Sequence, residues 1–180
     1  MAAFSRNPAT GAPSFVEFKQ AGVEGVDGLG GPIGVTVSPD GKRLYAASCV
    51  DKALAVFSRN APTGELTFVE THKDGSGLID GLAVAASVIV SPNGNQVYVA
   101  GNIYNTVTMF SRNSATVELT IAQIWRDSVG GVDGLDGASS IAISPDEKHL
   151  YTSERDDDAA AAFSRSIPSA DLEISENRLP

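Results

Sequence analysis

The sequence lacks the cysteines needed for an internal disulfide and the long apolar run needed to span a bilayer. Its 180 residues include one cysteine, Cys49, so an intrachain disulfide is excluded. No apolar stretch approaches the roughly 20 residues that span a membrane. The first residues also lack the apolar segment of a signal peptide. We therefore expect no membrane partner, and a cytoplasmic location by default.

Basic residues are scarce as well. Lysine and arginine total 13 against 22 aspartate and glutamate residues, which gives a net charge of -9. Nucleic-acid binding needs a basic surface, so a nucleic-acid partner is excluded. An acidic loop face that receives a small molecule or a protein fits this charge balance.

Internal repetition dominates what is present. Three motifs, Phe-Ser-Arg, Ser-Pro and Asp-Gly-Leu, each recur every 53 residues. They begin at Phe4, Phe57, Phe110 and Phe163, at Ser38, Ser91 and Ser144, and at Asp27, Asp80 and Asp133. A period near 50 is typical of β-propeller blades, each of which is one small sheet.

One repeat unit reads as four antiparallel strands. In the first complete copy these are residues 35–37, 44–47, 55–57 and 66–70, which we call strands a, b, c and d. A Ser-Pro-Asp-Gly turn joins a to b, with proline fixing φ and glycine tolerating positive φ. Glu147 replaces that glycine in the third copy, so its turn should be less favourable. The predicted fold class is all-β, a propeller.

The chain divides into one domain of incomplete blade number. Residues 1–180 form a single propeller domain, in which 1–20 is a c–d hairpin without a and b strands. Complete blades are expected at 33–70, 86–123 and 139–176. Three blades and a hairpin leave apolar faces and strand edges open. Either the chain is part of a longer propeller, or copies associate as a homo-oligomer, such as a dimer.

The Ser-Arg pair that follows each repeated phenylalanine predicts a structural contact. Because it recurs in every copy, we expect its arginine to bond a neighbouring turn carbonyl or the aspartate of Ser-Pro-Asp.

Residues 38–48, Ser-Pro-Asp-Gly-Lys-Arg-Leu-Tyr-Ala-Ala-Ser, followed by 55–59, Ala-Val-Phe-Ser-Arg, resemble a known repeat. It is the repeat of the lactonase-type β-propellers, a group with 6-phosphogluconolactonase and carboxymuconate-cyclising enzymes, and of the YVTN-repeat surface proteins. The resemblance implies a seven-bladed propeller and, for its enzymes, histidine, arginine and glutamate around the channel. No residue here matches those catalytic positions one by one.

Aspartates gather in the loops that join d to a and b to c, which share one face of a propeller. Asp27, Asp80 and Asp133 are equivalent by repeat and are expected to form an arc around the axis. Converging carboxylates suit Ca²⁺ or Mg²⁺. Alternatively, each aspartate caps its own glycine-rich turn through backbone N–H groups.

The third b–c loop departs most from the repeat. It carries an acidic run in which Glu154, Asp156 and Asp157 are candidate binding residues, because non-repeated loops often carry function. The alternative is a solvated charge run.

A second departure lies at the ends of the d strands. His72, beside Asp74, is a candidate general base. Trp125 is a candidate stacking platform, and Arg126 a candidate catalytic or anion-binding group. Alternatively, these residues form the exposed ends of outermost strands.

Two functions follow. The first is a scaffold that binds a ligand or a protein without catalysis. The second is a lactone hydrolase, in which a divalent cation held by loop carboxylates polarises the carbonyl and activates water.

Overall fold

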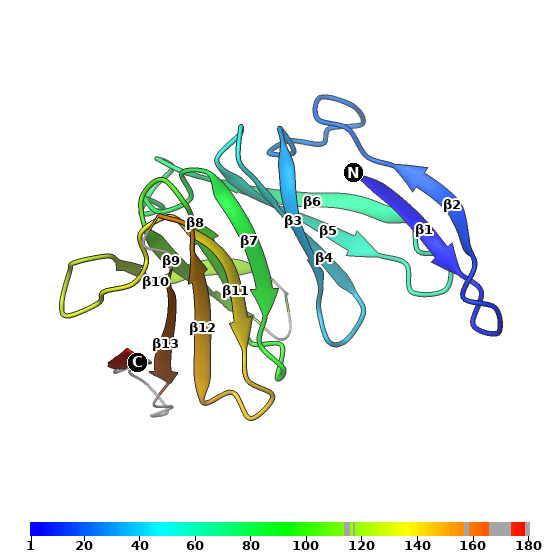
Figure 1. Ribbon diagram of the computed structural model, residues 1–180. Coiled ribbons are helices and arrows are strands. Elements are labelled where there is room, and N and C mark those ends of the chain that lie inside the picture. Colours follow the sequence, from blue (N-terminus) through cyan, green and yellow to red (C-terminus); the bar gives the residue numbers. More distant parts are fainter. Residues whose placement is uncertain (114–115, 117, 157–158, 166–173, 179–180) are drawn as a thin grey trace.

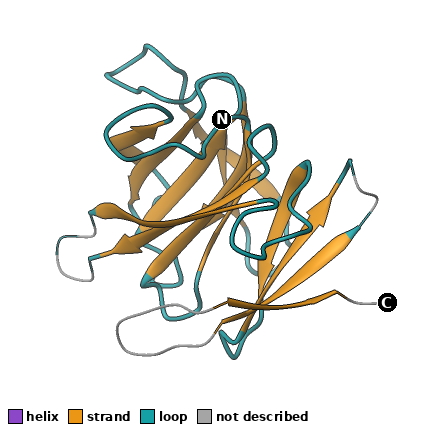
Figure 2. Cartoon of the chain, turned by 90° about the vertical axis from the view of Figure 1, so that its left-hand side faces the viewer, coloured by secondary structure: helices purple, strands orange, loops and turns teal. Residues whose placement is uncertain are grey.

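A computed structural model describes residues 1–113, 116, 118–156, 159–165 and 174–178. All regular structure in these residues is β-strand, arranged as three four-stranded antiparallel sheets and one two-stranded sheet (Figures 1 and 2). The described residues contain no helix that could cross a bilayer. The predicted all-β fold, three blades and a hairpin, is confirmed.

Strands follow one another in sequence order within every sheet. The hairpin consists of β1 (Ala2–Arg6) and β2 (Pro13–Phe18). Blade 1 consists of β3 (Pro32–Val37), β4 (Arg43–Ser48), β5 (Ala53–Arg59) and β6 (Leu66–Lys73). Blade 2 consists of β7 (Ala85–Val90), β8 (Gln96–Gly101), β9 (Thr106–Arg112) and β10 (Leu119–Arg126). Blade 3 consists of β11 (Ala138–Ile143), β12 (His149–Glu154), β13 (Ala160–Arg165) and β14 (Ile174–Arg178).

The first strands of the three blades lie side by side, with β7 packed against both β3 and β11 (Figure 1). Small side chains make this approach possible. A Cβ atom at Gly34 would lie 2.9 Å from the Ala86 carbonyl oxygen and 3.0 Å from Ser87 Cα on β7. A larger residue would push the inner strands apart, so the first strand of a blade has to carry small residues on this side.

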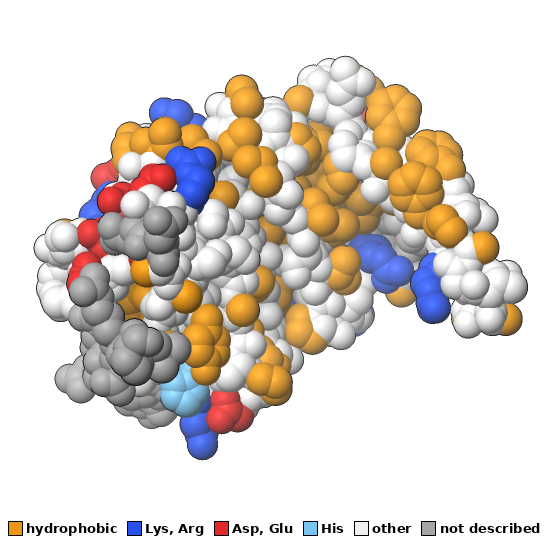
Figure 3. Space-filling model, in the orientation of Figure 1, with side chains coloured by type: hydrophobic (Ala, Val, Ile, Leu, Met, Phe, Trp, Pro, Cys, Tyr) orange, Lys and Arg blue, Asp and Glu red, His pale blue; other side chains and the backbone are white. Residues whose placement is uncertain are grey.

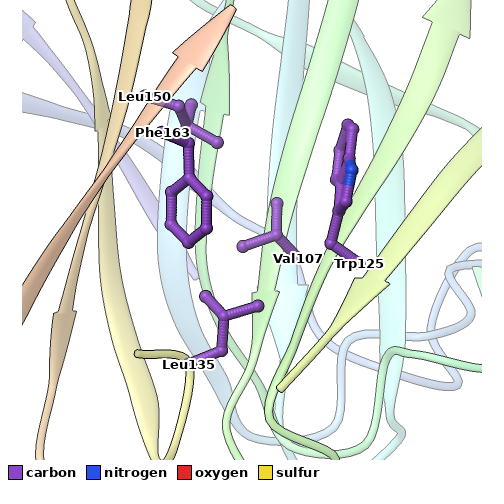
Figure 4. Close-up of a pocket in the computed structure, with 5 residues that line it drawn as sticks. All are labelled: Val107, Trp125, Leu135, Leu150 and Phe163. Carbon is purple, nitrogen blue, oxygen red and sulfur yellow. The ribbon is translucent and has the colours of Figure 1, made fainter. Parts of the chain in front are cut away.

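The core consists of apolar layers between neighbouring sheets. Phe57 is buried against the hairpin side of blade 1, Phe110 against blade 1 and Phe163 against blade 2. Repeat-equivalent residues therefore occupy equivalent places, as the 53-residue period predicts. Between blades 2 and 3 the layer closes around a cavity of only about 10 Å³, lined by Val107, Trp125, Leu135, Leu150 and Phe163 (Figure 4).

Polar contacts hold the Ser-Pro turns in place. Arg59 Nη1 donates to the Gly41 carbonyl at 3.0 Å, and Arg112 Nη1 donates to the Gly94 carbonyl at 3.1 Å. Arg112 also reaches blade 1, where its Nη2 donates to Asp40 Oδ2 at 2.8 Å. Both contacts expected for the Ser-Arg pairs are present.

The third turn has a compensating contact. Glu147 adopts φ of 61°, close to the left-handed values of Gly41 and Gly94 at the same position, which is strained for a side chain. Its carboxylate accepts hydrogen bonds from the backbone N–H and the side-chain amide of Asn93 in blade 2, the latter at 2.6 Å. The residue that weakens its own turn thus ties blade 3 to blade 2.

Two equivalent phenylalanines allow a matched test of the layered core. Phe110→Ala should lower the free energy of unfolding by about 3–5 kcal/mol, because a fully buried ring leaves a cavity. Phe4→Ala should cost about 1 kcal/mol or less, because Phe4 is 59% exposed. Urea unfolding monitored by circular dichroism measures both. Equal losses would contradict the assignment of Phe4 to an open face.

The Asp40–Arg112 ion pair predicts that the free energy of unfolding depends on pH. Burial of the Asp40 carboxyl raises its pKa, but hydrogen bonds from Ser38 and Arg112 outweigh this effect and hold the pKa well below its usual value. The pair therefore stabilises the fold above the pKa of about 3.9 in the unfolded chain, and this contribution falls as the pH drops below about 4. Asp40→Asn should lower the free energy of unfolding at pH 7, and this effect should shrink steadily as the pH falls from about 4 to about 2. Asp146→Asn is the control, because Asp146 bonds its own turn. Identical profiles would contradict the inter-blade role.

Candidate functional site

The b–c turns lie against the start of the innermost strand of each blade. In blade 1 the Cys49 N–H donates to the Gly31 carbonyl at 3.0 Å. Asn102 N–H donates to the Val84 carbonyl at 3.1 Å in blade 2, and Arg155 N–H to the Gly137 carbonyl at 3.3 Å in blade 3. Cys49, Asn102 and Arg155 are 53 residues apart, and we call them the mouth positions.

One backbone frame thus presents three different functional groups: a thiol, a carboxamide and a guanidinium. Arg155 is the cation among them; its side chain is 70% exposed, and its Nε donates to Asp156 Oδ1 at 3.1 Å. Asn102 Nδ2 donates to the Gly137 carbonyl of blade 3 at 2.8 Å. Residues that vary on a conserved frame are suited to ligand recognition.

Blade 2 also fixes the start of β11, beside Arg155. Asn105 Oδ1 accepts the Gly137 N–H at 3.0 Å, and its Nδ2 donates to Asp136 Oδ1 at 2.6 Å. Asn102 and Asn105 of the second b–c turn therefore bond Gly137, the residue whose carbonyl accepts the Arg155 N–H.

Backbone strain marks the same place in blade 2. Val84 has φ of 53°, where the equivalent residues Gly31 and Gly137 have 61° and 69°. Left-handed φ is a true outlier for a β-branched residue, and such strain is concentrated at functional sites.

The acidic run divides into residues with different surroundings. Glu154 is buried at the end of β12, 3.5 Å from Thr152 Oγ1, and a Cβ atom at Gly134 would lie 3.1 Å from its Oε1. Asp156 lies at the surface beside Arg155. Asp157 lies outside the described residues. Glu154 and Asp156 both flank Arg155, and of these two Asp156 is the exposed residue that pairs with it.

Two of the three predicted metal residues, Asp27 and Asp80, have basic partners. Asp27 Oδ1 lies 2.7 Å from Lys73 Nζ, and Asp80 Oδ2 lies 2.9 Å from Arg126 Nη2, each at the end of an outermost strand. The Lys73 ammonium lowers the pKa of Asp27. In the described part of the chain, no three histidine, cysteine, aspartate or glutamate side chains are grouped to hold a metal. Asp133 belongs to no such group either.

The contacts of Asp27 agree with the alternative prediction, since its Oδ1 also accepts the Gly28 N–H at 2.8 Å. The carboxylate caps its own turn and pairs with the outer strand of the blade that follows. The sequence could not distinguish this turn-capping role from an arc of carboxylates around the axis. Equivalence by repeat shows that the aspartates occupy the same position in each blade, but it does not show where their side chains point.

The other candidates lie at the ends of the outermost strands β6 and β10. His72 Nε2 is 3.4 Å from Glu70 Oε1 and its ring centre is 5.2 Å from that of Phe110, whereas Asp74 accepts backbone N–H groups of its own loop. Arg126 is paired with Asp80.

Trp125 is 7% exposed and packs between blades 2 and 3 (Figure 4). The alternative expectation of exposed strand ends is therefore wrong for Trp125 and for His72, whose side chain is 15% exposed. His72 on β6 lies against Phe110 of β9, and Trp125 on β10 packs in one cluster with Phe163 of β13, so the following blade covers both side chains.

Sequence reasoning missed the mouth positions themselves. Position-by-position alignment of the three b–c turns gives Cys49, Asn102 and Arg155, and that change of chemistry at one repeat position was the available signal. The strain at Val84 had no signal beyond a valine where two other copies have glycine.

Comparison with known proteins finds one matching family model and several structures of similar fold. The family model described as "Lactonase, 7-bladed beta-propeller" matches residues 87–178. A candidate 6-phosphogluconolactonase from Bacteroides uniformis is similar with a TM-score of 0.72 at 20% identity, over 99% of this chain and 48% of that one. A periplasmic gluconolactonase from Pseudomonas aeruginosa gives 0.71 at 22% identity, over 98% and 50%.

A third structure, of a protein from Lactobacillus plantarum, has a TM-score of 0.74 at 22% identity, over 97% of this chain and 47% of that one. At these identities the likeness shows the fold. The chain spans about half the length of these structures. No curated protein matches the sequence significantly.

The basic partners of Asp27 and Asp80 predict how the chain responds to cations. Lys73→Met and Arg126→Met should each lower the melting temperature slightly, because each removes an ion pair at a surface loop. Millimolar calcium should neither restore that loss nor raise the melting temperature of the wild type. Thermal unfolding with calcium or with a chelator measures this. A calcium-dependent rise in the wild type that Asp27→Asn abolishes would support the metal prediction instead.

Proposed function

Since the chain belongs to the family of seven-bladed lactonase β-propellers, we propose that it binds and hydrolyses a lactone at the mouth positions. The observation that carries the proposal is the pair Arg155–Asp156, an exposed guanidinium held at 3.1 Å from a carboxylate on the b–c turn of blade 3. Neighbouring blades present Cys49 and Asn102 at the equivalent positions.

Lactone hydrolysis sets two chemical demands. Water adds to the carbonyl carbon, the ring C–O bond breaks, and the ring oxygen takes a proton, which gives a hydroxy acid. The carbonyl oxygen gains negative charge in the transition state, and a guanidinium aimed at it stabilises that charge. A carboxylate beside the guanidinium orients it and accepts a proton from water. Arg155 fits the first role and Asp156 the second.

Charge narrows the substrate class. Asp136 and Asp156 both lie near Arg155, and the chain as a whole carries a net charge of -9. This field repels a phosphorylated lactone and any other polyanion. A neutral lactone therefore fits this mouth better than a sugar phosphate.

A binding scaffold without catalysis is the second candidate. One observation favours it: Asn102 and Asn105 are engaged in bonds to blade 3, which gives the turns a structural task. On this view the mouth positions recognise a ligand and leave it unchanged.

A lactone panel distinguishes the two. We expect the chain to hydrolyse gluconolactone and a homoserine lactone faster than a phosphorylated gluconolactone. Arg155→Ala should lower kcat/KM about 100-fold, because one oxyanion-stabilising donor is lost. Arg155→Lys should recover part of it. Release of acid measured by pH-stat gives the rates, with and without a chelator.

Lys148→Ala is the control, since Lys148 is exposed on an a–b turn at the opposite face. Absence of hydrolysis by the folded chain, together with ligand binding in saturation-transfer NMR, would replace the hydrolase by the scaffold. Loss of activity with the chelator would bring a divalent cation into the mechanism.

A further inference from the structure

The hairpin β1–β2 is the outer half of a blade. Its register reproduces that of β5–β6: Ala2 pairs with Phe18 as Ala55 pairs with Thr71, and both ladders shift at the repeated phenylalanine. In each four-stranded sheet the third strand is paired on both sides. Among the described strands β1 pairs with β2 alone, so one edge of β1 is open.

A bare apolar face lies beside that edge. Ile33, Val35 and Val37 are exposed on β3 and alternate with Gly34, whose side of the strand faces β7, so they lie on the opposite side, toward the hairpin. Hydrophobic side chains are visible between blade 1 and the hairpin in Figure 3. Val35 is 57% exposed, whereas its equivalent on β7, Val88, is 4% exposed because blade 1 covers it. The hairpin covers only the outer part of blade 1, where Met1 packs with Phe57 and Leu66. The bare face therefore continues an inter-blade interface that is already half formed.

We propose that this place is a docking site for a two-stranded a–b hairpin of the chain's own repeat type. The second strand of such a hairpin pairs with β1 as β4 pairs with β5, where Leu44 lies opposite Phe57 and Tyr45 opposite Val56. Its tyrosine and alanine then cover Val35, as Tyr45 and Ala47 cover Val88. One two-stranded ligand would therefore both pair with the open edge of β1 and cover the apolar face of β3.

A second folded copy of this chain does not fit the site. The a and b strands described in each blade are already paired with c strands, and β1–β2 occupies the outer half of the site. A whole blade would collide with the hairpin, so the occupant has two strands. The inference depends on the fold and is independent of lactone hydrolysis.

A fusion in register provides the test. Met1 is equivalent to Leu54, so a copy of residues 32–53 placed directly before Met1 keeps the 53-residue period. We expect this fusion to melt about 4 °C or more above the wild type and to slow amide exchange in β1 about tenfold. Hydrogen exchange read by mass spectrometry locates the protection. The synthetic hairpin of residues 32–48, added to the wild-type chain, should protect the same strand.

Val35→Lys in the chain is the matched control. Val35 is exposed, so the substitution should leave the unfused chain folded with nearly the same melting temperature, while its charge prevents docking and cancels the gain. A fusion without protection of β1, or protection that persists with Val35→Lys, overturns the proposal. So does a concentration-dependent dimer of the wild type that Val35→Lys dissociates, since a second copy is then the occupant.

Discussion

Every part of this molecule depends on one constraint: a blade has two apolar faces, and both have to be covered by neighbouring blades. A four-stranded sheet of this size cannot bury enough area alone, so its stability is shared with the sheets beside it. Phe110 and Val88 are buried for this reason, and Phe4 and Val35 are exposed for the same reason, since the sheets that would cover them are absent from the described residues. The open edge of β1 and the bare face of β3 result from the same constraint.

The same constraint explains why the mouth positions are suited to function. The repeat fixes a backbone hydrogen bond between each b–c turn and the start of its innermost strand. The side chain at that position contributes little to the blade core, so it can differ between blades. A thiol, a carboxamide and a guanidinium are therefore held in equivalent places, and the carboxamide of Asn102 also bonds the Gly137 carbonyl of blade 3.

The period of 53 residues was sufficient to predict the strands, the turns and the contacts of the Ser-Arg pairs, because these depend on local sequence and on equivalence between copies. The period could not predict which side chains at the outer strands are covered by the neighbouring blade. Trp125 and His72 lie near the ends of β10 and β6, yet the neighbouring blade covers them. Asp27 and Asp80 lie 46 residues before their basic partners, a pairing that becomes visible only when the outer strand returns beside the loop.

The placement of positive charge completes the argument for the site. Lysine and arginine are few, and the structure gives several of them a partner: Arg112 binds Asp40, Lys73 binds Asp27, and Arg126 binds Asp80. Arg155 differs from these three because its only described ion-pair partner, Asp156, is its neighbour in the chain, and its side chain stays largely exposed. Lys148 is likewise exposed and paired within its own turn, with Asp146, but it lies on an a–b turn, so Arg155 is set apart by its place on a b–c turn. A cation that ties no two elements together has little structural purpose. In the function that we propose, this guanidinium attracts the carbonyl oxygen of a neutral lactone, and the carboxylates of Asp136 and Asp156 disfavour anions.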